Sequence, residues 1–343
     1  MLRKFLPGVF GGVFSLVLLL GMAWMGLDWY GDSLVLAEGE TEFVIMPGDS
    51  LIRVLSRLDA EGIIAYPTLF RLMTAREDGS TSLQAGEYLI TPDMTRQELL
   101  ATFMQGRVRQ FNITLVEGRT LNDVLDMLNV HPKLVSPMEL DDVIAIVNEM
   151  AEGGNPEGLF YPDTYHFAAG TPVETILRIA HDRLEKVLAE EWQNKADGLP
   201  YKSPYEALIM ASIVERETGA PFERGDIAGV FVRRLKKGMR LQTDPTVIYG
   251  VGERYEGRIT RRMLREATAY NTYVIRGMPP TPIALAGREA IHAALNPVAG
   301  SALYFVAKGD GTHQFSKTLA EHNQAVRKYQ IAERREDYRS TLQ

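Results

Sequence analysis

FVIMPGDSL at Phe43–Leu51 and ITLVEGRTL at Ile113–Leu121 share one pattern, although seventy residues separate them. Each begins with a short apolar strand, continues through a glycine turn and a Ser or Thr helix cap, and passes into an amphipathic helix. A third copy, YLITPDMT at Tyr88–Thr95, lies between them and carries a capping-box pattern. Strand–turn–helix units are common, but the shared spacing favours related modules and predicts an α+β fold for residues 41–130.

Length, charge and composition limit the class of protein. The chain has 343 residues, enough for two or three domains, and a net charge of -7 with no basic tract. Nucleic acid is therefore not an expected partner. The chain has no cysteine, which excludes disulfides, thiolate metal sites and a cysteine nucleophile. It also has no phosphate-binding glycine loop and no G-x-S-x-G motif, so nucleotide chemistry and a serine hydrolase are not expected.

The N-terminus predicts a membrane anchor. Phe5–Leu27 is 23 residues long without a charge, which is enough to cross a bilayer. Arg3 and Lys4 precede it, whereas Asp28 and Asp32 follow. Because positive charge stays on the cytoplasmic side, the rest of the chain is expected outside the cytoplasm.

Aromatic residues at the end of this segment are typical of a membrane interface, namely Trp24, Trp29 and Tyr30. A cleaved signal peptide is the alternative, but the apolar run is long and lacks an obvious cleavage site. We therefore assign residues 1–30 to a cytoplasmic tip and a transmembrane anchor. Gly31–Thr41 is predicted to be a short polar stalk.

ASIVERET at Ala211–Thr218 places two carboxylates at the end of a strongly apolar predicted helix. At 100° per residue, Glu217 falls in the middle of the side formed by Ile209, Met210, Ile213 and Val214. Glu215 falls about 160° away, beside Leu208, Ala211 and Ser212. Burying a carboxylate raises its pKa, which is the property that a general acid needs. The alternative is a salt-bridged glutamate at a helix end.

Three polar and aromatic clusters follow this helix. They are Leu241–Gly250 (LQTDPTVIYG), Tyr270–Tyr273 (YNTY) and the proline-rich Gly277–Ile283 (GMPPTPI). Aromatic rings next to amides and hydroxyls are what an oligosaccharide groove uses, and a proline-held loop is suited to form a groove wall. Each cluster is also compatible with ordinary turns.

The remaining pattern completes the secondary structure. Helices are predicted at Thr175–Trp192, Pro204–Thr218, Ile227–Lys237 and Thr318–Arg335, and a strand at Leu303–Ala307. The first of these helices is expected to bury Ile176, Ile179, Leu184 and Val187. His313 and His322 lack the i, i+4 spacing of a helical metal site, and no third ligand is apparent, so no metal is expected.

These segments resemble the endolytic murein transglycosylases of the MltG (YceG-like) family over nearly the whole chain, as far as about Tyr329. Besides the acid-bearing segment and the three clusters, the resemblance rests on Glu157–Tyr165 and Tyr304–Asn323. The family implies a LysM-like module at residues 41–107 and a mixed α+β catalytic domain at residues 108–340 that carries its acid on a helix. The module matches the LysM pattern only loosely, which puts its glycan affinity in doubt.

The resemblance implies a lytic transglycosylase that cleaves the β-1,4 bond between N-acetylmuramic acid and N-acetylglucosamine and leaves 1,6-anhydro ends. The family's catalytic Glu stands immediately before a Thr or Ser, which assigns the role to Glu217, with Glu215 as the runner-up. No cofactor is expected. The candidates for contacting the sugars are Gln242, Thr243, Asp244, Tyr249, Tyr270, Asn271, Thr272, Tyr273, His322 and Asn323.

The anchor and the family together predict a single-pass protein of the cell inner membrane, with a periplasmic catalytic domain that cuts nascent glycan and terminates its elongation. Cell-wall synthases are expected partners. Two other functions stay open. One is a non-catalytic, membrane-anchored scaffold that binds peptidoglycan, and the other is a muramidase in which Asp244 serves as a second carboxylate and water attacks.

Overall fold

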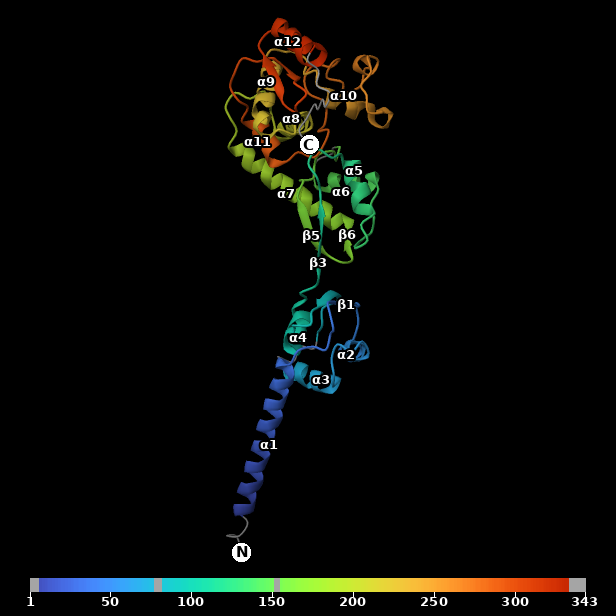
Figure 1. Cartoon of the computed structure of the whole chain (residues 1–343), viewed down its shortest axis with the longest axis vertical. Helices are drawn as coiled ribbons and strands as arrows, with labels where there is room; N and C mark the ends of the chain where they lie inside the picture. The colour runs from blue at the N-terminus through green and yellow to red at the C-terminus, as the bar shows by residue number, and fades with distance from the viewer. Residues whose placement is uncertain (1–5, 77–81, 151–154, 333–343) are drawn as a thin grey trace. The chain divides into compact units, whose positions relative to one another are not determined.

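The computed structural model describes residues 6–76, 82–150 and 155–332, and it divides into two compact units (Figure 1). Unit 1 comprises residues 1–111 and 166–170, and unit 2 comprises residues 112–165 and 171–343. Both mix helices with short two-stranded sheets, which agrees with the predicted α+β class.

Unit 1 begins with a single apolar helix, α1 (Leu6–Asp32), which is long and apolar enough to cross a membrane. The elements that follow it in unit 1 are β1 (Thr41–Ile45), α2 (Leu51–Ala60), α3 (Pro67–Arg76), β2 (Gly86–Ile90) and α4 (Arg96–Gln105). β1 and β2 pair antiparallel, with Phe43 opposite Tyr88. The predicted caps are present, because Ser50 begins α2 and Thr95 begins α4 with a capping box.

The core of unit 1 includes side chains from α1 itself. Tyr30 is 4% exposed and its hydroxyl donates to the carbonyl of Ala65 at 2.5 Å. Phe43, Tyr88 and Phe103 form the aromatic centre, in which the last two rings lie edge to face 4.8 Å apart. The end of α1 is therefore part of the folded module.

The segment Gly31–Thr41 is not the polar stalk that its position suggested. Val35 is buried, and its N–H donates to the carbonyl of Met94 at 2.9 Å. The N–H of Leu36 donates to the carbonyl of Ile63 at 2.7 Å. The apolar run Leu34–Leu36 explains the correction, because burying Val35 and pairing its neighbours stabilises a packed connection over a solvated one.

Unit 2 contains the strand–helix copy at Ile113–Leu121 and the helices that surround the acid-bearing segment. Its first elements are the end of β3 (Gln110–Thr114), α5 (Leu121–Asn129), β4 (Leu134–Val135), α6 (Leu140–Met150), the start of β5 (Thr164–Ala168) and β6 (Thr171–Pro172). The other residues of β3 and β5 belong to unit 1. β3 pairs with β5, and β4 pairs parallel with β6. Thr120 caps α5 with a capping box, as the repeat predicted.

The second half of unit 2 is mainly helical. It comprises α7 (Val173–Gln193), α8 (Pro204–Glu217), η2 (Pro221–Glu223), α9 (Arg224–Lys236), α10 (Asp244–Val251), η3 (Gly252–Arg254), η4 (Met263–Arg265) and α11 (Arg288–Leu295). α8 is the central helix, because it packs against α7, α9, α10 and α11. All residues from Ala207 to Val214 are buried.

The helices predicted at Thr175–Trp192, Pro204–Thr218 and Ile227–Lys237 are present, with boundaries that differ by up to three residues. One expected core residue is wrong, because Ile179 on α7 is 46% exposed. Leu177 and Ala180 are buried in its place. Ile176, Leu184 and Val187 are buried as predicted, and Leu177 lies about 160° from Ile179 around the helix, so the buried stripe extends toward Leu177 and leaves Ile179 at its exposed edge.

The C-terminal part forms a hairpin and a broken helix. β7 (Tyr304–Ala307) pairs antiparallel with β8 (His313–Ser316). The predicted last helix is α12 (Leu319–Val326), which continues as the π-helix η5 (Arg327–Ala332). The last predicted helical residues, 333–335, lie outside the described part of the chain.

Candidate active site

Glu217 is the last residue of α8. The helix ends there because Thr218 adopts an extended conformation, with φ -142° and ψ 137°. The Thr218 hydroxyl accepts a hydrogen bond from the N–H of Ala220 at 2.9 Å, which holds the turn that follows. Glu217 therefore projects from a helix end whose position is set by a buried core.

A hydroxyl group faces the Glu217 carboxyl group directly. Thr243, which precedes α10, donates from Oγ1 to Oε2 of Glu217 at 2.5 Å. Burial raises the pKa of Glu217 to about 7, while the Thr243 hydrogen bond lowers it and the nearby charge of Asp244 raises it. A carboxyl group with this pKa holds its proton in a large fraction of molecules at neutral pH.

Glu215 lies two residues earlier in a different environment. Its side chain is 5% exposed and pairs with Arg224 at 3.1 Å. Its Oε2 accepts a hydrogen bond from the backbone N–H of Gly287 at 3.0 Å. Burial raises the pKa of Glu215, and the positive charge of Arg224 opposes that rise. These contacts tie α8 to α9 and to the start of α11, which is a structural role.

A cavity of about 720 Å³ opens beside Glu217, and α8, α10, α12 and the β7–β8 hairpin contribute its walls. Six of the residues predicted from the sequence line it, namely Glu217, Gln242, Asp244, Tyr273, His322 and Asn323. Asp244 is exposed and accepts a hydrogen bond from the Tyr273 hydroxyl at 2.7 Å. The structure thus brings residues separated by about a hundred positions to one cavity.

Two other predicted residues, Asn271 and Thr272, lie in the protein interior next to the cavity lining. Asn271 is 1% exposed, and its side-chain amide donates to the carbonyls of Met263 and Glu266. Thr272 is fully buried, and its hydroxyl lies 2.8 Å from that of Thr246. Neither Asn271 nor Thr272 lines the cavity, because their polar groups are used inside the protein to hold the chain around Thr243.

Tyr249 and Tyr270 also lie away from the cavity lining. Their rings meet edge to face, with centroids 4.7 Å apart. The Tyr249 hydroxyl donates to Glu157 at 3.0 Å, and the Tyr270 hydroxyl lies 2.8 Å from that of Thr281. They act as interior packing residues rather than as a sugar platform.

Glu157 is a buried acid that residue patterns did not single out individually. It is 5% exposed and accepts hydrogen bonds from the Leu121 N–H and the Tyr249 hydroxyl, both at 3.0 Å. Burial raises its pKa to about 7. Because it contacts the first turn of α5 and does not line the cavity, its raised pKa reflects burial in the interior.

Arg234 is the most important cavity residue that the sequence reasoning missed. Its guanidinium donates to the carbonyls of Leu303 at 2.6 Å and Leu241 at 2.7 Å, and to Oε1 of Gln242 at 3.3 Å. Gln242 has φ 54°, a left-handed conformation that is rare outside glycine. The sequence feature that could have identified Arg234 is its place among the apolar residues of the segment that forms α9.

The same guanidinium lies 5.0 Å from the ring centroid of Tyr304. His322 stacks on Tyr304, with ring centroids 5.3 Å apart and an angle of 24° between the planes. Burial and the charge of Arg234 lower the pKa of His322, which favours a neutral ring. The layered side chains form an aromatic wall on which a sugar ring can stack.

The proline-rich segment Gly277–Ile283 was expected to form a groove wall, but it contributes no residue to the cavity lining. Ile283 is buried, and its N–H donates to the hydroxyl of Ser212 on α8 at 3.0 Å. The segment therefore braces α8 from the side away from the cavity lining. Sequence could not distinguish these two uses of a stiff loop.

His313 forms a buried pair with Glu223. The backbone N–H of His313 donates to Glu223 at 2.9 Å, and Nδ1 lies 2.8 Å from its other oxygen. This pair fixes the hairpin to η2. Within residues 6–76, 82–150 and 155–332, no group of three or more His, Cys, Asp or Glu side chains is arranged to hold a metal ion.

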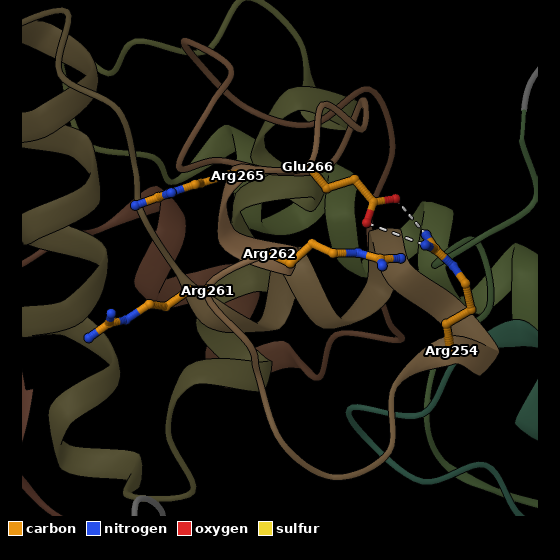
Figure 2. A pocket seen from close by; sticks show the side chains of 5 residues that line it. All are labelled: Arg254, Arg261, Arg262, Arg265 and Glu266. Carbon is orange, nitrogen blue, oxygen red and sulfur yellow. Dashed lines mark hydrogen bonds and ion pairs between the residues drawn. The ribbon is translucent and has the colours of Figure 1, made fainter.

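A second cavity, of about 520 Å³, lies on the segment that follows α10 and carries a basic cluster (Figure 2). Its lining consists of Arg254, Arg261, Arg262, Arg265 and Glu266. Arg254 pairs with Glu266 at 2.7 Å, whereas Arg261 and Arg265 point away from that pair. Four arginines and one glutamate leave an excess of positive charge, which favours carboxylate or phosphate groups.

Known proteins are similar to this chain over the part that contains these residues. Residues 43–328 match the YceG-like family. A protein of Bacillus subtilis (strain 168) named endolytic murein transglycosylase is 32% identical over 308 residues, which are 83% of this chain and 83% of that protein. A protein of the same name from Streptococcus pneumoniae serotype 2 is 23% identical, and its alignment covers 91% of this chain and 63% of that protein.

A solved structure also matches. The crystal structure of a yceG-like protein from Listeria monocytogenes superposes with a TM-score of 0.54 and 29% sequence identity. The match covers 84% of this chain and 99% of that one. The similarity therefore extends through both the N-terminal module and the region around Glu217.

Proposed function

We infer that this chain, which belongs to the YceG-like family, is a lytic transglycosylase that acts on peptidoglycan. The observation that carries the inference is the position of Glu217. It is a helix-end carboxyl group with a pKa of about 7 that lines a cavity with polar and aromatic walls. The name shared by the relatives from Bacillus subtilis and Streptococcus pneumoniae supports the same activity.

In the proposed mechanism, protonated Glu217 donates its proton to the glycosidic oxygen between N-acetylmuramic acid and N-acetylglucosamine. General acid catalysis of this kind contributes about 10²–10⁴ in rate. Thr243 donates a hydrogen bond to Oε2 of Glu217, which leaves the other oxygen to carry the proton toward the substrate. The bond to the leaving sugar breaks as positive charge develops at C1 of the muramic acid.

The second step needs no second carboxylate. The 6-hydroxyl of the same muramic acid attacks C1 and closes a 1,6-anhydro ring, and its effective concentration is high because it is in the same molecule. Glu217, now ionised, accepts the proton from that hydroxyl. The hydroxyl of Tyr273 engages Asp244, which supports a role for Asp244 in binding sugar hydroxyls rather than as a base.

For the sugar contacts we propose the cavity residues Gln242, Asp244, Tyr273, His322 and Asn323, with Tyr304 as the stacking surface. Arg234 positions Gln242 through its hydrogen bond and its contact with the preceding backbone carbonyls. Thr243 acts on Glu217 and not on the sugar. Tyr249, Tyr270, Asn271 and Thr272 hold this arrangement from the interior.

We further propose that α1 anchors the protein as a single pass through the cell inner membrane, with the N-terminus in the cytoplasm. Its long apolar run within Gly12–Asp32, preceded by Arg3 and Lys4 and followed by acidic residues, supports this topology. In this arrangement residues 41–107 form a LysM-like module and residues 108–340 form a periplasmic catalytic domain. Enzyme held close to the membrane meets nascent glycan strands and terminates their elongation, beside the cell-wall synthases that make them.

The test is mass spectrometry of the products formed from uncrosslinked glycan strands by the full chain in detergent micelles. The full chain is preferable to a fragment that starts at residue 31, because such a fragment lacks the buried Tyr30. Products that end in 1,6-anhydro-muramic acid are expected. Reducing ends, heavier by one water, would instead mean hydrolysis with Asp244 as a second carboxylate.

Glu217→Gln provides the matched control for the scaffold alternative. The variant keeps the shape of the side chain and cannot donate the proton, so we expect cleavage to be lost while binding to isolated cell-wall sacculi persists. If the unmodified chain binds sacculi but produces no cleavage even with membrane-attached nascent strands, the protein is a peptidoglycan-binding scaffold.

A further inference from the structure

The helix α3 exposes apolar side chains on a side that the module does not cover. Phe70, Met73 and Thr74 face the core of unit 1 and are buried. Leu72 is 54% exposed and Leu69 is 37% exposed. At 100° per residue, these two leucines and Arg76 lie within about 60° of one another on the helix.

The C-terminal end of α3 is fixed against the last turns of α1. Arg76 forms an ion pair with Asp28, and its guanidinium lies 4.0 Å from the ring centroid of Trp24. Met73 packs against Gly31, where an added Cβ would lie 3.1 Å from its sulfur. Together these contacts place α3 beside the Trp24–Gly31 part of α1.

That part of α1 is the end of its apolar segment. Trp24 lies four residues before Asp28, which corresponds to about 6 Å toward the bilayer at about 1.5 Å per residue. An arginine over a tryptophan at this depth is typical of the boundary between lipid headgroups and acyl chains. Arg76 therefore reaches toward the bilayer, and Leu69 and Leu72 share its side of α3.

Other apolar side chains are exposed near α3. Trp29 and Leu34 expose apolar side chains around the same end of α1. Figure 1 shows α3 at the end of the module that α1 enters, and it runs across α1 instead of along it. A short helix in this orientation can rest on a bilayer with one side in lipid and the other against the module core.

We propose that α3 lies in the outer interface of the membrane that α1 spans, with Leu69 and Leu72 inserted at the headgroup–acyl boundary. The occupant of this surface is the phospholipid bilayer itself. The inference rests on the proposed anchoring by α1, and it adds a second membrane contact. Two contacts fix the orientation of the module on the membrane, whereas a single helix leaves it free to tilt.

The experiment uses the absence of cysteine from the chain. Single variants Leu69→Cys and Leu72→Cys of the full chain receive a nitroxide label and are placed in nanodiscs of phosphatidylethanolamine and phosphatidylglycerol. Electron paramagnetic resonance then measures collisions of the label with oxygen, which enters lipid, and with a nickel chelate, which stays in water. Both side chains are exposed, so the labels do not disturb the core.

Two further labels serve as references. Val44→Cys lies on β1, which Figure 1 draws at the other end of the module from α3, and its label should collide mainly with the nickel chelate. Leu18→Cys lies within the span of α1, and its label should collide mainly with oxygen. A water-exposed label at Leu18 would refute the anchor itself, which separates that failure from a failure of the present proposal.

The expected result is that labels at Leu69 and Leu72 resemble the label at Leu18, at a depth of about 5–10 Å. Labels that resemble the one at Val44 would overturn the proposal. Spin–spin broadening between labels would overturn it in favour of a second copy of the chain, and protection that appears only on addition of glycan strands would overturn it in favour of a glycan-binding surface.

Discussion

The surroundings of Glu215 and of Glu217 differ sharply, although the two acids are two residues apart on α8. Glu215 is paired with Arg224 and accepts a backbone hydrogen bond, and its side chain lies away from the cavity. Glu217 lines the cavity and accepts a hydrogen bond from the hydroxyl of Thr243. Among the residues that the structure describes, Glu215 is paired with a positive charge and Glu217 is not.

The two acids therefore differ in their partners rather than in burial, and we propose the one without a charged partner as the catalytic acid. Burial raises the pKa of both groups, so desolvation alone does not distinguish them. An opposite charge within hydrogen-bond distance favours the ionised form, whereas a hydroxyl group compensates it only weakly. The comparison therefore predicts that substitution of the two acids has different consequences.

Glu217→Gln tests the catalytic side of the comparison and should have the largest effect. We expect the rate of glycan cleavage to fall by about 10²–10⁴, because the amide cannot donate the proton. The measurement is the initial rate of release of anhydro-muramic ends. Thermal unfolding of the variant at about pH 4, below the ordinary pKa of a glutamate, should match that of the unmodified chain. A normal cleavage rate would exclude Glu217 as the acid.

Glu215→Gln tests the structural side. Removing the buried partner leaves Arg224 with only the more exposed Glu117 and Glu289 among the described residues, and we expect the free energy of unfolding to fall by about 3–5 kcal/mol. Urea denaturation measures this change. Glu289→Gln is the matched control, because Glu289 also pairs with Arg224 but its side chain is 69% exposed.

For that control we expect a loss of at most about 1 kcal/mol. Equal losses of unfolding free energy in the Glu215 and Glu289 variants would mean that burial of the Glu215–Arg224 pair does not add to stability. Residual cleavage per folded molecule should stay near normal in Glu215→Gln, and a loss comparable to that of Glu217→Gln would contradict the distinction between the two acids.

The pH dependence of stability sharpens the comparison further. The pKa of Glu217 is about 7 in the folded protein and 4.5 without its surroundings, so the folded state holds a proton that the unfolded state releases. Stability therefore falls as pH rises from about 4.5 to about 7 and then stays low. Because the cavity admits water, we expect a loss of about 2–3 kcal/mol from this group.

Glu217→Gln removes this titration. The free energy of unfolding of the variant minus that of the unmodified chain should therefore be larger at pH 8.5 than at pH 5. Urea denaturation of both proteins at the two pH values measures this difference. Glu157 titrates in the same range and remains in both proteins, so its contribution cancels in the comparison. A difference between the two proteins that does not change with pH would show that Glu217 is not protonated in the folded state.

Thr243→Val should have the smallest effect. The Thr243 hydroxyl lowers the pKa of Glu217, so its removal should raise that pKa. The pH at which activity is half lost should therefore move to a higher value. At neutral pH we expect about a tenfold lower rate, since loss of one hydrogen bond costs about 1–1.5 kcal/mol. Thr243→Ser keeps the hydroxyl and should restore both the rate and the pH profile.

Local sequence patterns predicted much of the fold. Ser50, Thr95 and Thr120 each cap a helix after a short strand, as the repeated spacing indicated. These features depend on hydrogen bonds between residues that are a few positions apart, so the local sequence is enough to predict them. The same patterns missed the packing of Gly31–Thr41, because it depends on contacts with Ile63 and Met94 from other elements.

The predicted site shows the same limit. Gln242, Asp244 and Asn271 look alike in sequence, as polar residues of turns near the acid. Only the structure separates Gln242 and Asp244, which line the cavity, from Asn271, whose amide is used by internal carbonyls. Arg234 was missed because its partner Leu303 lies 69 residues away in the sequence.

By itself, the sequence determined that an apolar helix begins the chain, that strand–helix units follow, and that two acids end a buried helix. These are properties of neighbouring residues, and periodicity and capping report them. Only the tertiary structure decided which partner each acid has. Arg224 reaches Glu215 from α9 and Thr243 reaches Glu217 from the start of α10, and the partner of a buried charge sets its free energy.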